Sequence, residues 1–361
     1  MSLSPSLRAI SGTGGKGPAC FLVETRQVRL LLDLGYGPQP GLFPDVGAVG
    51  EIDAVLLSHA HRDHAGGLCL LAKLGSPPVY ATESVARGLP KEIEARVLPL
   101  RGTTDVVGVR LETGRSGHAP GGIWIRVAVG EGLLYMGDHS RESILYAFDT
   151  PPEARTIIID GSYGTDDTPL AERFKKFDPL FGLPEVLLPV PADGRGPEIA
   201  LYVSRKGSSV LHIDDAVRSA LRGLAAADRA SLRGGIATEI AQIAQTAGAI
   251  EGPRGVMLAS RADATAGEAA RLIGLWKNAR DPAIVFTGYV PAGTPAERLV
   301  RTGRGSYLRW NVHPRLSDNV ALVRATHAKK VIPAFCELGD LADVARALAP
   351  AQVTIDMPVT L

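Results

Sequence analysis

The chain has 361 residues, of which 45% are hydrophobic and only 5% are aromatic. This length accommodates two domains, or one large domain with an insertion, and the composition is typical of a folded α/β protein with an aliphatic core. The formal net charge of +1 excludes a strongly basic protein. A polyanionic ligand would therefore need local clusters of positive charge rather than a global field.

The sequence also carries signals about its cellular environment. The start, MSLSPSLRAI, lacks the long apolar core of a signal peptide, and no stretch approaches the roughly 18 apolar residues of a membrane span. The three cysteines, Cys20, Cys69 and Cys336, are too few and too scattered for a disulfide framework. We therefore expect a soluble protein of the reducing cytoplasm that does not bind membranes.

The first 160 residues contain short apolar runs that predict β-strands separated by glycine-rich turns. A helix is predicted near AGGLCLLAKLG, directly after a cluster of histidines. Polar side chains follow several of the strands, at Asp33, His59, Asp138 and Asp160. Open α/β sheets bind ligands at the carboxyl ends of their strands, so we expect a functional site there.

From about residue 173 the pattern changes to strands that alternate with helices, which predicts a separate parallel α/β layer. Helical runs are expected at 215–227, at 235–247 and at GEAARLIGLWKNA. After about residue 302 short strands return. The predicted organisation is a first domain formed by residues 1–172 and completed by residues 302–361, with a second domain inserted at residues 173–301.

The segment SHAHRDHAGGL, residues 58–68, places four metal-ligating side chains directly after a buried strand. On an extended chain His59 and His61 project to the same face, while Asp63 and His64 follow where the chain turns toward a helix. One histidine alone would more often be structural, but four such side chains together predict a metal site. Imidazole and carboxylate suit zinc better than magnesium or calcium, which prefer oxygen ligands only.

This segment resembles the signature of the metallo-β-lactamase fold, an αββα sandwich that binds one or two metals at a sheet edge. LLLDLG, SGHAPGG and YMGDHSRE resemble three further motifs of that fold, in the expected order. The resemblance implies a first zinc ion held by three histidines, and a second held by two carboxylates and a histidine. Asp138 would bridge the two ions, and Asp33 would support the ligands from behind. The implied ligands are His59, His61 and His118 for the first ion, and Asp63, His64 and Asp138 for the second.

Later segments resemble the β-CASP nucleases, a family that includes RNase J, the pre-mRNA 3′-end cleavage endonuclease and compact bacterial exonucleases. IIIDGSYG resembles an acidic motif of that family and contains Asp160, and WNVHPRLSDN resembles a histidine motif and contains His313. LLPVPADGRGPEI and the segment from GVMLAS to AERLV resemble the opening and the closing half of its inserted domain. The implied fold is an αββα metallo-β-lactamase sandwich with an inserted parallel α/β β-CASP domain.

The resemblance also suggests roles for residues outside the metal ligands. Asp160 and His313 could form a carboxylate–imidazole pair that contacts a phosphate oxygen or protonates a leaving 3′-oxygen. Gly194 and Arg195 could bind a phosphate at a helix start, although an ordinary turn with a surface arginine is an equal alternative. The catalytic candidates are Asp63, His313 and Asp160. His139, His212 and His327 match no motif, and we expect structural or solvent-facing roles for them.

The sequence departs from the β-CASP pattern at the last strand, KKVIPAFCELGD. There the family has a histidine that ligates the second metal, and this chain has Phe335, which cannot bind a metal. Three outcomes follow: a weak second site held by Asp63, His64 and Asp138, a replacement ligand at Cys336, or loss of efficient nuclease activity. Because all other ligands are present, we favour a retained but altered site that holds one or two zinc ions.

We therefore expect a zinc-dependent hydrolase that cleaves phosphodiester bonds of nucleic acid, with single-stranded RNA favoured over DNA. The main alternatives are a DNA exonuclease that acts in repair and a catalytically weak protein that binds nucleic acid or serves as a scaffold. A metallohydrolase of small molecules is a third alternative, which the inserted domain disfavours. For assembly, the resemblance suggests a homodimer or a complex with an active paralogue.

Overall fold

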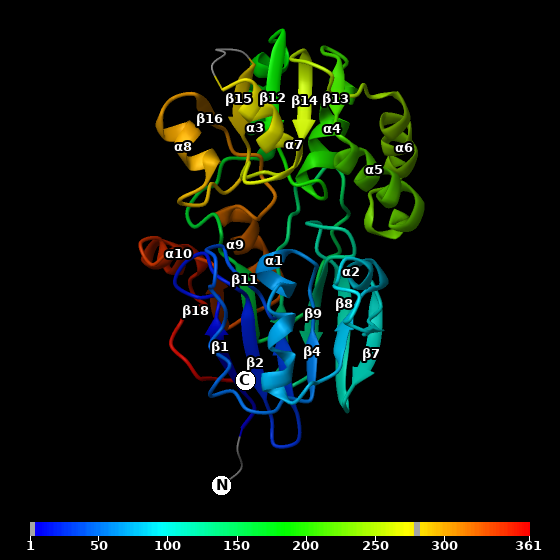
Figure 1. The fold of residues 1–361 in the computed structure, drawn as a ribbon. Coiled ribbons are helices and arrows are strands. Elements are labelled where there is room, and N and C mark those ends of the chain that lie inside the picture. Colours follow the sequence, from blue (N-terminus) through cyan, green and yellow to red (C-terminus); the bar gives the residue numbers. More distant parts are fainter. Residues whose placement is uncertain (1–3, 278–281) are drawn as a thin grey trace. The chain divides into compact units, whose positions relative to one another are not determined.

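Two seven-stranded sheets organise the first of two units in the computed structural model, which describes residues 4–277 and 282–361 (Figure 1). This unit comprises Met1–Arg141, Phe148–Asp167 and His313–Leu361. The first sheet has the order β19 (Val359–Thr360), β1 (Ser6–Ser11), β2 (Cys20–Glu24), β3 (Arg29–Leu32), β4 (Ala54–Leu56), β5 (Val79–Ala81), β6 (Ala95–Val97). The second has the order β18 (Gln352–Val353), β17 (Lys330–Ala334), β11 (Thr156–Asp160), β10 (Leu133–Tyr135), β9 (Ile123–Val127), β8 (Val109–Arg115), β7 (Gly102–Val106).

Alternate residues of these strands enter different layers, because side chains along a strand alternate between its two faces. Leu30 and Leu32 of β3 pack between the two sheets, whereas Leu31 packs on the outer face of the first sheet. In the second sheet Ile158 faces the first sheet, and Ile157 faces outward. Short helices cover both outer faces. They are α1 (Arg62–Ala65), η1 (Leu68–Leu74) and α2 (Glu83–Arg87) on the first sheet, and α9 (Leu316–Ala325) and α10 (Leu341–Leu348) on the second.

This helix–sheet–sheet–helix arrangement confirms the predicted α/β sandwich. One local prediction was wrong, because the expected helix at AGGLCLLAKLG is interrupted and its second part is a 3-10 helix. The break falls at Gly66 and Gly67, and a Cβ at Gly67 would lie 2.4 Å from the carbonyl oxygen of Gly35. Gly67 lies so close to the backbone of Gly35 that a side chain would not fit at this position, and the helix is interrupted here.

The strands that precede the predicted polar residues are parallel, so their carboxyl ends meet at one edge. β3 pairs in parallel with β4, and β11 pairs in parallel with both β10 and β17. Asp33 follows β3, Ser58 and His59 follow β4, Asp138 follows β10, and Asp160 ends β11. The sandwich therefore brings residues that are more than a hundred positions apart in the chain to a single edge.

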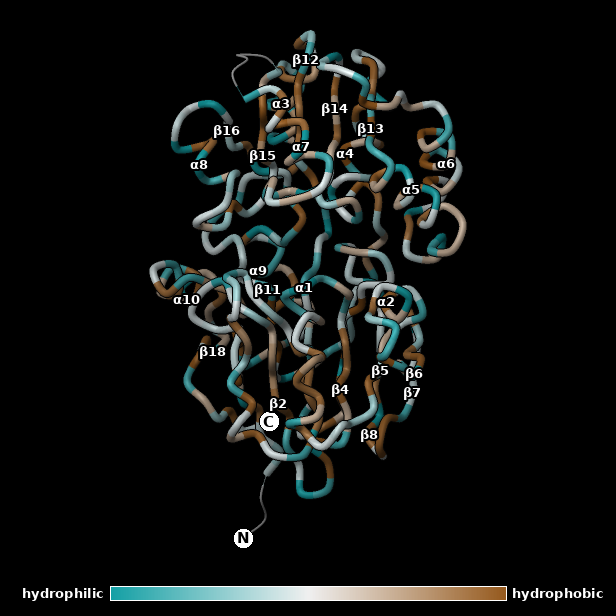
Figure 2. Tube along the Cα trace, viewed as in Figure 1, coloured by the Kyte–Doolittle hydropathy of each residue, from teal (hydrophilic) through white to brown (hydrophobic). Residues whose placement is uncertain are grey.

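The second unit comprises Glu142–Ala147 and Thr168–Val312 and is built on a parallel five-stranded sheet. Val186 and Leu188 pack on one face of this sheet with the helices between residues 170 and 246, while Leu187 packs on the other with the helices between residues 267 and 301. Figure 2 shows the central strands as mainly hydrophobic. The order is β13 (Leu211–Ile213), β14 (Gly255–Ala259), β12 (Glu185–Pro189), β15 (Ala283–Phe286), β16 (Gly305–Tyr307). The helices are α3 (Leu170–Phe181), α4 (Arg195–Lys206), α5 (Asp215–Ala227), η2 (Arg229–Ser231), α6 (Ile236–Thr246), α7 (Gly267–Leu275) and α8 (Pro295–Arg301).

The helices expected at 215–227 and 235–247 correspond to α5 and α6, and the helical run expected at GEAARLIGLWKNA begins as α7. The last two residues of that run lie outside the described residues. The domain boundaries predicted after residue 172 and after residue 301 stay a prediction. In the structure the second unit interrupts the first, and the short segment Glu142–Ala147 groups with the second unit as well.

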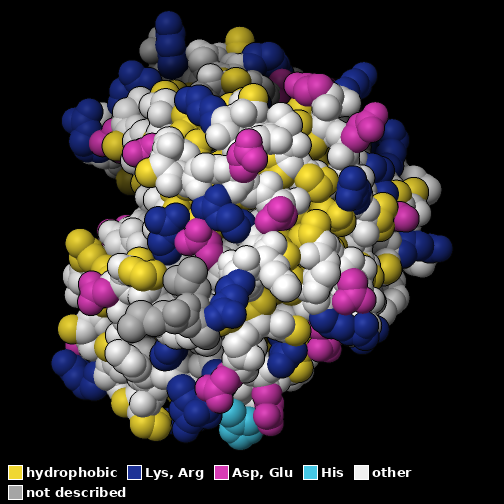
Figure 3. Space-filling view, turned by 90° about the horizontal axis from the view of Figure 1, so that it is seen from below, with side chains coloured by type: hydrophobic (Ala, Val, Ile, Leu, Met, Phe, Trp, Pro, Cys, Tyr) yellow, Lys and Arg dark blue, Asp and Glu magenta, His cyan; other side chains and the backbone are white. Residues whose placement is uncertain are grey.

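The surface charge and the helix lengths bear on the expectations about a basic coat and a membrane span. On the face shown in Figure 3, Lys and Arg side chains are interspersed with Asp, Glu and apolar side chains, so the described residues form no continuous basic surface there. Across residues 4–277 and 282–361, no helix has both the length and the apolar character that a membrane crossing requires.

The close approach of Gly35 to the backbone of Asp63 leads to a prediction about stability. A Cβ at Gly35 would lie 1.8 Å from the backbone oxygen of Asp63, which cannot move aside as a flexible side chain would. Gly35→Ala should therefore lower the free energy of unfolding by about 1–3 kcal/mol or more, measured by urea denaturation. The matched control is Gly339→Ala, because a Cβ there meets nothing within 4 Å. Equal stability of the two variants would contradict the prediction.

Candidate metal centre

Four side chains at the sheet edge converge into one group, namely His59, His61, His118 and Asp138. One ligand atom from each lies within 4.8 Å of the others. His118 Nε2 lies 3.0 Å from His61 Nδ1 and 3.4 Å from Asp138 Oδ2. His59 Nε2 lies 3.8 Å from the same Asp138 oxygen. Three imidazoles and a carboxylate at these separations are a suitable donor set for zinc.

A second group shares Asp138 with the first and adds Asp63 and His64. His64 Nε2 lies 3.1 Å from Asp138 Oδ1, the oxygen that does not face the first group. Each carboxylate oxygen of Asp138 therefore faces one group. This is the geometry that a bridging carboxylate would require, and it places the six predicted ligands together.

The buried polar atoms of this edge are consistent with a bound cation. His59 Nε2 is buried and has no hydrogen-bond partner within the described part of the chain. An unpaired buried polar atom costs free energy, and a cation held by the first group would satisfy this nitrogen. Burial, followed by the charge of His64, holds the pKa of His59 well below its usual value. This direction favours the neutral ring, the form that binds a metal.

Asp33 lies behind the ligands and connects them to the core. Its carboxylate accepts hydrogen bonds from Ser58 N at 2.7 Å, from Ser58 Oγ at 2.6 Å and from the Tyr135 hydroxyl at 2.5 Å. Its Oδ2 also lies 2.6 Å from His64 Nδ1. A carboxylate that holds the second ring nitrogen fixes both the tautomer and the orientation of a ligating histidine. Asp33 thus directs His64 Nε2 toward Asp138.

Asp160 and His313 form the predicted pair at the same edge. His313 Nδ1 lies 2.8 Å from Asp160 Oδ2 and 3.7 Å from Asp138 Oδ2. Burial opposes ionisation of Asp160, but the neighbouring His313 outweighs it and lowers the pKa of this carboxyl below its usual value. Asn319 donates to the backbone oxygen of Asp160 at 2.8 Å and so fixes the strand end. The His313 side chain remains 15% exposed, which leaves it accessible to a substrate.

Sequence reasoning missed one residue of this edge, Lys16. Its Nζ lies 2.6 Å from Asp63 Oδ2 and 5.0 Å from the centre of the Phe335 ring. Burial disfavours the charged forms of both Lys16 and Asp63. For Asp63 the nearby Lys16 ammonium, followed by His64, nevertheless holds the pKa well below its usual value. A lysine in the glycine-rich segment GTGGKGPAC was the only signal, and nothing in its local pattern indicated a metal-site neighbour.

The remaining predicted candidates lie elsewhere. Cys336 packs in the outer cluster beneath α9 and α10 and belongs to none of the metal-ligating groups found among the described residues. Burial raises the pKa of its thiol to about 11, which disfavours a thiolate ligand. Gly194 and Arg195 are in the second unit, where Gly194 has a φ of 69° and Arg195 begins α4. A Cβ at Gly288 would lie 2.3 Å from the Arg195 guanidinium, so this glycine makes room for it.

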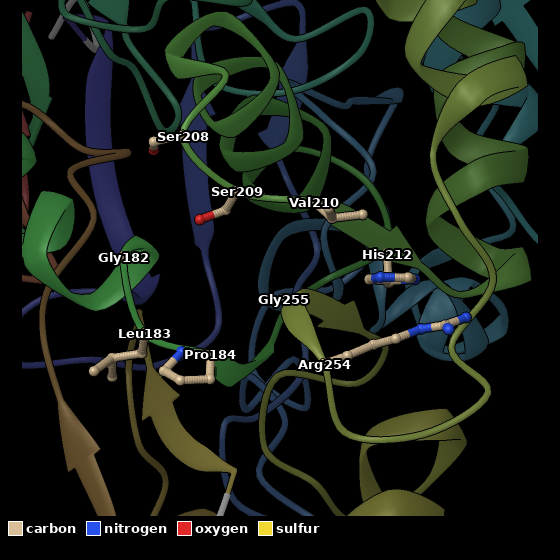
Figure 4. Close-up of a pocket in the computed structure, with 9 residues that line it drawn as sticks. All are labelled: Gly182, Leu183, Pro184, Ser208, Ser209, Val210, His212, Arg254 and Gly255. Atoms are coloured by element: carbon tan, nitrogen blue, oxygen red, sulfur yellow. The ribbon is translucent and has the colours of Figure 1, made fainter.

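The second unit also has a pocket of about 430 Å³, shown in Figure 4. It lies at the amino ends of β12, β13 and β14, whereas ligands of parallel sheets usually bind at the carboxyl ends. His212 lines it, and Nδ1 of that ring lies 2.9 Å from the backbone oxygen of Ala249. This contact agrees with the structural role expected for His212, and the pocket contains none of the predicted site residues.

The comparisons with known proteins agree with this geometry. Residues 13–190 match the Metallo-beta-lactamase superfamily. This segment is similar to a metallo-beta-lactamase domain. The sequence-based resemblance is thereby confirmed for the segment that carries the ligands of both groups.

The curated relatives include proteins with nucleic-acid functions in their names. The transcription termination factor FttA of Cenarchaeum symbiosum is 29% identical over 248 residues, which are 55% of this chain and 38% of that protein. Ribonuclease TTHA0252 of Thermus thermophilus is 32% identical over 186 residues, 42% of this chain and 43% of that protein. The predicted resemblance to β-CASP nucleases is confirmed by these relatives. The chain spans less than half the length of either protein.

Among solved structures, a protein of unknown function from Enterococcus faecalis V583 has the same fold. The TM-score is 0.64 at 13% sequence identity, over 99% of this chain and 100% of that chain. At this identity the likeness shows the fold alone and carries no conclusion about substrate.

The contacts of Asp33 lead to a prediction about metal affinity. Asp33→Ala removes the partner of Ser58, of the Tyr135 hydroxyl and of His64 Nδ1 at once. Loss of such an orienting carboxylate should weaken zinc binding about 10–100-fold, measured by competition with a chelator of known affinity. The matched control is Tyr135→Phe, which removes one hydrogen bond and leaves His64 oriented. It should cost about 1 kcal/mol of stability and leave zinc affinity nearly unchanged. Unchanged affinity in Asp33→Ala would contradict the proposed orienting role.

Proposed function

We propose that this protein is a zinc-dependent nuclease that hydrolyses phosphodiester bonds of nucleic acid, with single-stranded RNA favoured over DNA. The observation that carries the proposal is the group of His59, His61, His118 and Asp138 beside the Asp160–His313 pair. The names of the relatives, a transcription termination factor and a ribonuclease, support action on RNA. The free cysteines support a reducing compartment, for which we propose the cytoplasm.

The residues divide into metal ligands and groups that act on the substrate. His59, His61 and His118 would hold the zinc ion, with Asp138 as its carboxylate ligand. When bound, zinc supplies positive charge at the attacked phosphate and makes water a stronger acid. The carboxylate of Asp33 keeps His64 in one orientation throughout.

His313 would transfer or share a proton with the substrate. Its Nδ1 faces Asp160, so the other ring nitrogen, Nε2, is available to a phosphate oxygen or a leaving 3′-oxygen. The Asp160 carboxylate orients the ring, and a protonated imidazole would present a donor at each nitrogen. General acid catalysis of this kind contributes typically about 10²–10⁴-fold to a rate.

The second unit would contribute to substrate binding. The start of α4, with Gly194 before it, would present backbone N–H groups to a phosphate, and Arg195 would add a guanidinium. As partners we propose single-stranded RNA and, for assembly, a second copy of the chain or a paralogue. A catalytically weak protein that binds nucleic acid is the second candidate, favoured by the apolar Phe335 beside His64 at a ring-centre distance of 5.4 Å.

A substitution at His313 tests the proposed acid. His313→Ala should lower kcat on single-stranded RNA about 10²–10⁴-fold, because the donor to the leaving group is lost. Zinc content should stay unchanged, since the four-residue group that holds the ion remains complete. The control is His327→Ala, an exposed histidine that pairs with Glu153 at the surface.

The same assay compares single-stranded RNA with single-stranded DNA of the same base sequence. Faster cleavage of DNA would replace the RNA preference with the DNA exonuclease alternative. A wild type that holds zinc but cleaves neither polymer would overturn the nuclease proposal and leave the binding protein as the conclusion.

The role of Arg195 is tested through binding rather than turnover. Arg195→Gln should raise KM for RNA several-fold with zinc content and kcat nearly unchanged, because one phosphate contact is lost. Arg222→Gln, an exposed arginine on α5, is the matched control. Equal KM values for the two variants would remove Arg195 from the substrate site.

A further inference from the structure

The ammonium of Lys16 lies at the second metal-ligating group, which consists of Asp63, His64 and Asp138. The Lys16 ammonium lies 2.6 Å from Asp63 Oδ2, the distance of a strong charge-assisted hydrogen bond. It also lies 5.0 Å from the centre of the Phe335 ring, within the range of a cation–π contact. The side chains of Lys16 and Asp63 are only 19% and 21% exposed. The ammonium is thus held inside the site rather than extended into solvent.

The loop that carries Lys16 is attached to the strand end that carries Phe335. Phe335 N donates to the backbone oxygen of Gly12 at 2.8 Å, and Lys16 N donates to Glu337 Oε1 at 3.4 Å. A Cβ at Gly15 would lie 3.1 Å from the Glu337 carboxylate, so the two segments are in close contact. The backbone as well as the charge therefore directs Lys16 toward Asp63.

These contacts leave little room for a second divalent ion. One oxygen of Asp63 is bonded to Lys16, and Phe335 presents a ring without a ligand atom on the adjacent side. His64 offers only Nε2, because its Nδ1 faces Asp33. A divalent ion here would lie close to the ammonium, and like charges at such a separation repel strongly in a partly buried site.

We propose that the Lys16 ammonium takes the place of a second metal ion, so that the protein binds one zinc ion, at His59, His61, His118 and Asp138. Lys16 and Phe335 then act as a pair: the ring covers the side from which a further ligand would come, and the ammonium neutralises Asp63. A lysine ammonium has three donors and Asp63 uses one of them. In a step that rests on the proposed function, a free donor contacts a phosphate oxygen of the substrate.

The first experiment counts metal without any substrate. The full chain is stripped with a chelator, titrated with zinc chloride by calorimetry, and its zinc is measured by mass spectrometry after gel filtration. Wild type should retain about one zinc ion per chain. Retention of two ions per chain would overturn the proposal at once.

Two substitutions separate the contributions of the pair. Phe335→His alone should still give one ion, because Lys16 keeps its place. Phe335→His combined with Lys16→Met should give two, because an imidazole is added and the cation is removed while the aliphatic stem is kept. A second ion in Phe335→His alone, or only one in a folded double variant, would contradict the proposal. The control is Lys91→Met, an exposed lysine, which should leave the count at one.

A further measurement applies where the double variant does not fold. Lys16→Met alone should take up a second zinc ion weakly at high zinc concentration, whereas Lys16→Arg, which keeps a cation, should not. Equal titration curves for wild type, Lys16→Met and Lys16→Arg would remove Lys16 from the second site.

The substrate contact is tested separately from the metal count. Lys16→Met, assayed at a zinc concentration that gives one ion per chain, should lower kcat at least about tenfold, by loss of a charged donor to the phosphate. Lys16→Arg should recover part of the loss. If the wild type cleaves no nucleic acid, the proposed function fails while the metal count still decides the role of Lys16. If cleavage is unchanged in Lys16→Met, only the phosphate contact fails.

Discussion

The carboxylate of Asp33 is the interaction on which the geometry of the metal edge depends. It follows β3 in the first sheet and accepts a hydrogen bond from Tyr135, which ends β10 in the second sheet. It also accepts from Ser58 and faces His64. One buried anion therefore connects the two sheets to each other and to the ligand segment. Its φ of 59° is unusual for a residue other than glycine and turns the chain sharply away from β3.

The charges of the site follow from this arrangement. Asp33, Asp63, Asp138 and Asp160 bring four carboxylates to one edge, and such a cluster is unstable without compensating positive charge. His313 compensates Asp160, and Lys16 compensates Asp63. The Asp138 carboxylate remains for a metal ion, together with the unpaired nitrogen of His59. The compensation by Lys16 requires no metal, so part of the site is stabilised whether or not zinc is bound.

Much of this site could be predicted from the sequence, because its strongest signals are local. His59, His61, Asp63 and His64 lie within six positions, and strand periodicity orients them without any tertiary information. The runs after which Asp33, Asp138 and Asp160 appear read as buried strands for the same reason. The interrupted helix after the histidines was missed, because it depends on the close passage of Gly67 by Gly35. That contact joins separate segments of the chain and leaves no periodic pattern.

Lys16 and Phe335 show why the rest could not be predicted. They are separated by more than three hundred positions, and each has an ordinary alternative role, as a surface lysine in a glycine-rich turn and as a core phenylalanine. The hydrogen bonds between residues 12–16 and 335–337 bring them together in the folded chain. Read alone, Phe335 indicated a site that is one ligand short. Considered together with Lys16, Phe335 belongs to a site with two replacements. The phenylalanine stands in place of a metal ligand, and the Lys16 ammonium stands in place of the second metal ion.

All the ligands, His313 and Lys16 belong to the first unit, although His313 follows the second unit in the chain. The chemistry of the edge is therefore complete without any residue of the inserted unit. Asp160 and His313 lie on opposite sides of most of that insertion in the sequence, and their 2.8 Å contact brings the two ends of the insertion close together. A change confined to the inserted unit thus leaves these ligands in place. A change that displaces His313 would act on the chemistry directly, since its ring touches Asp160 and faces Asp138.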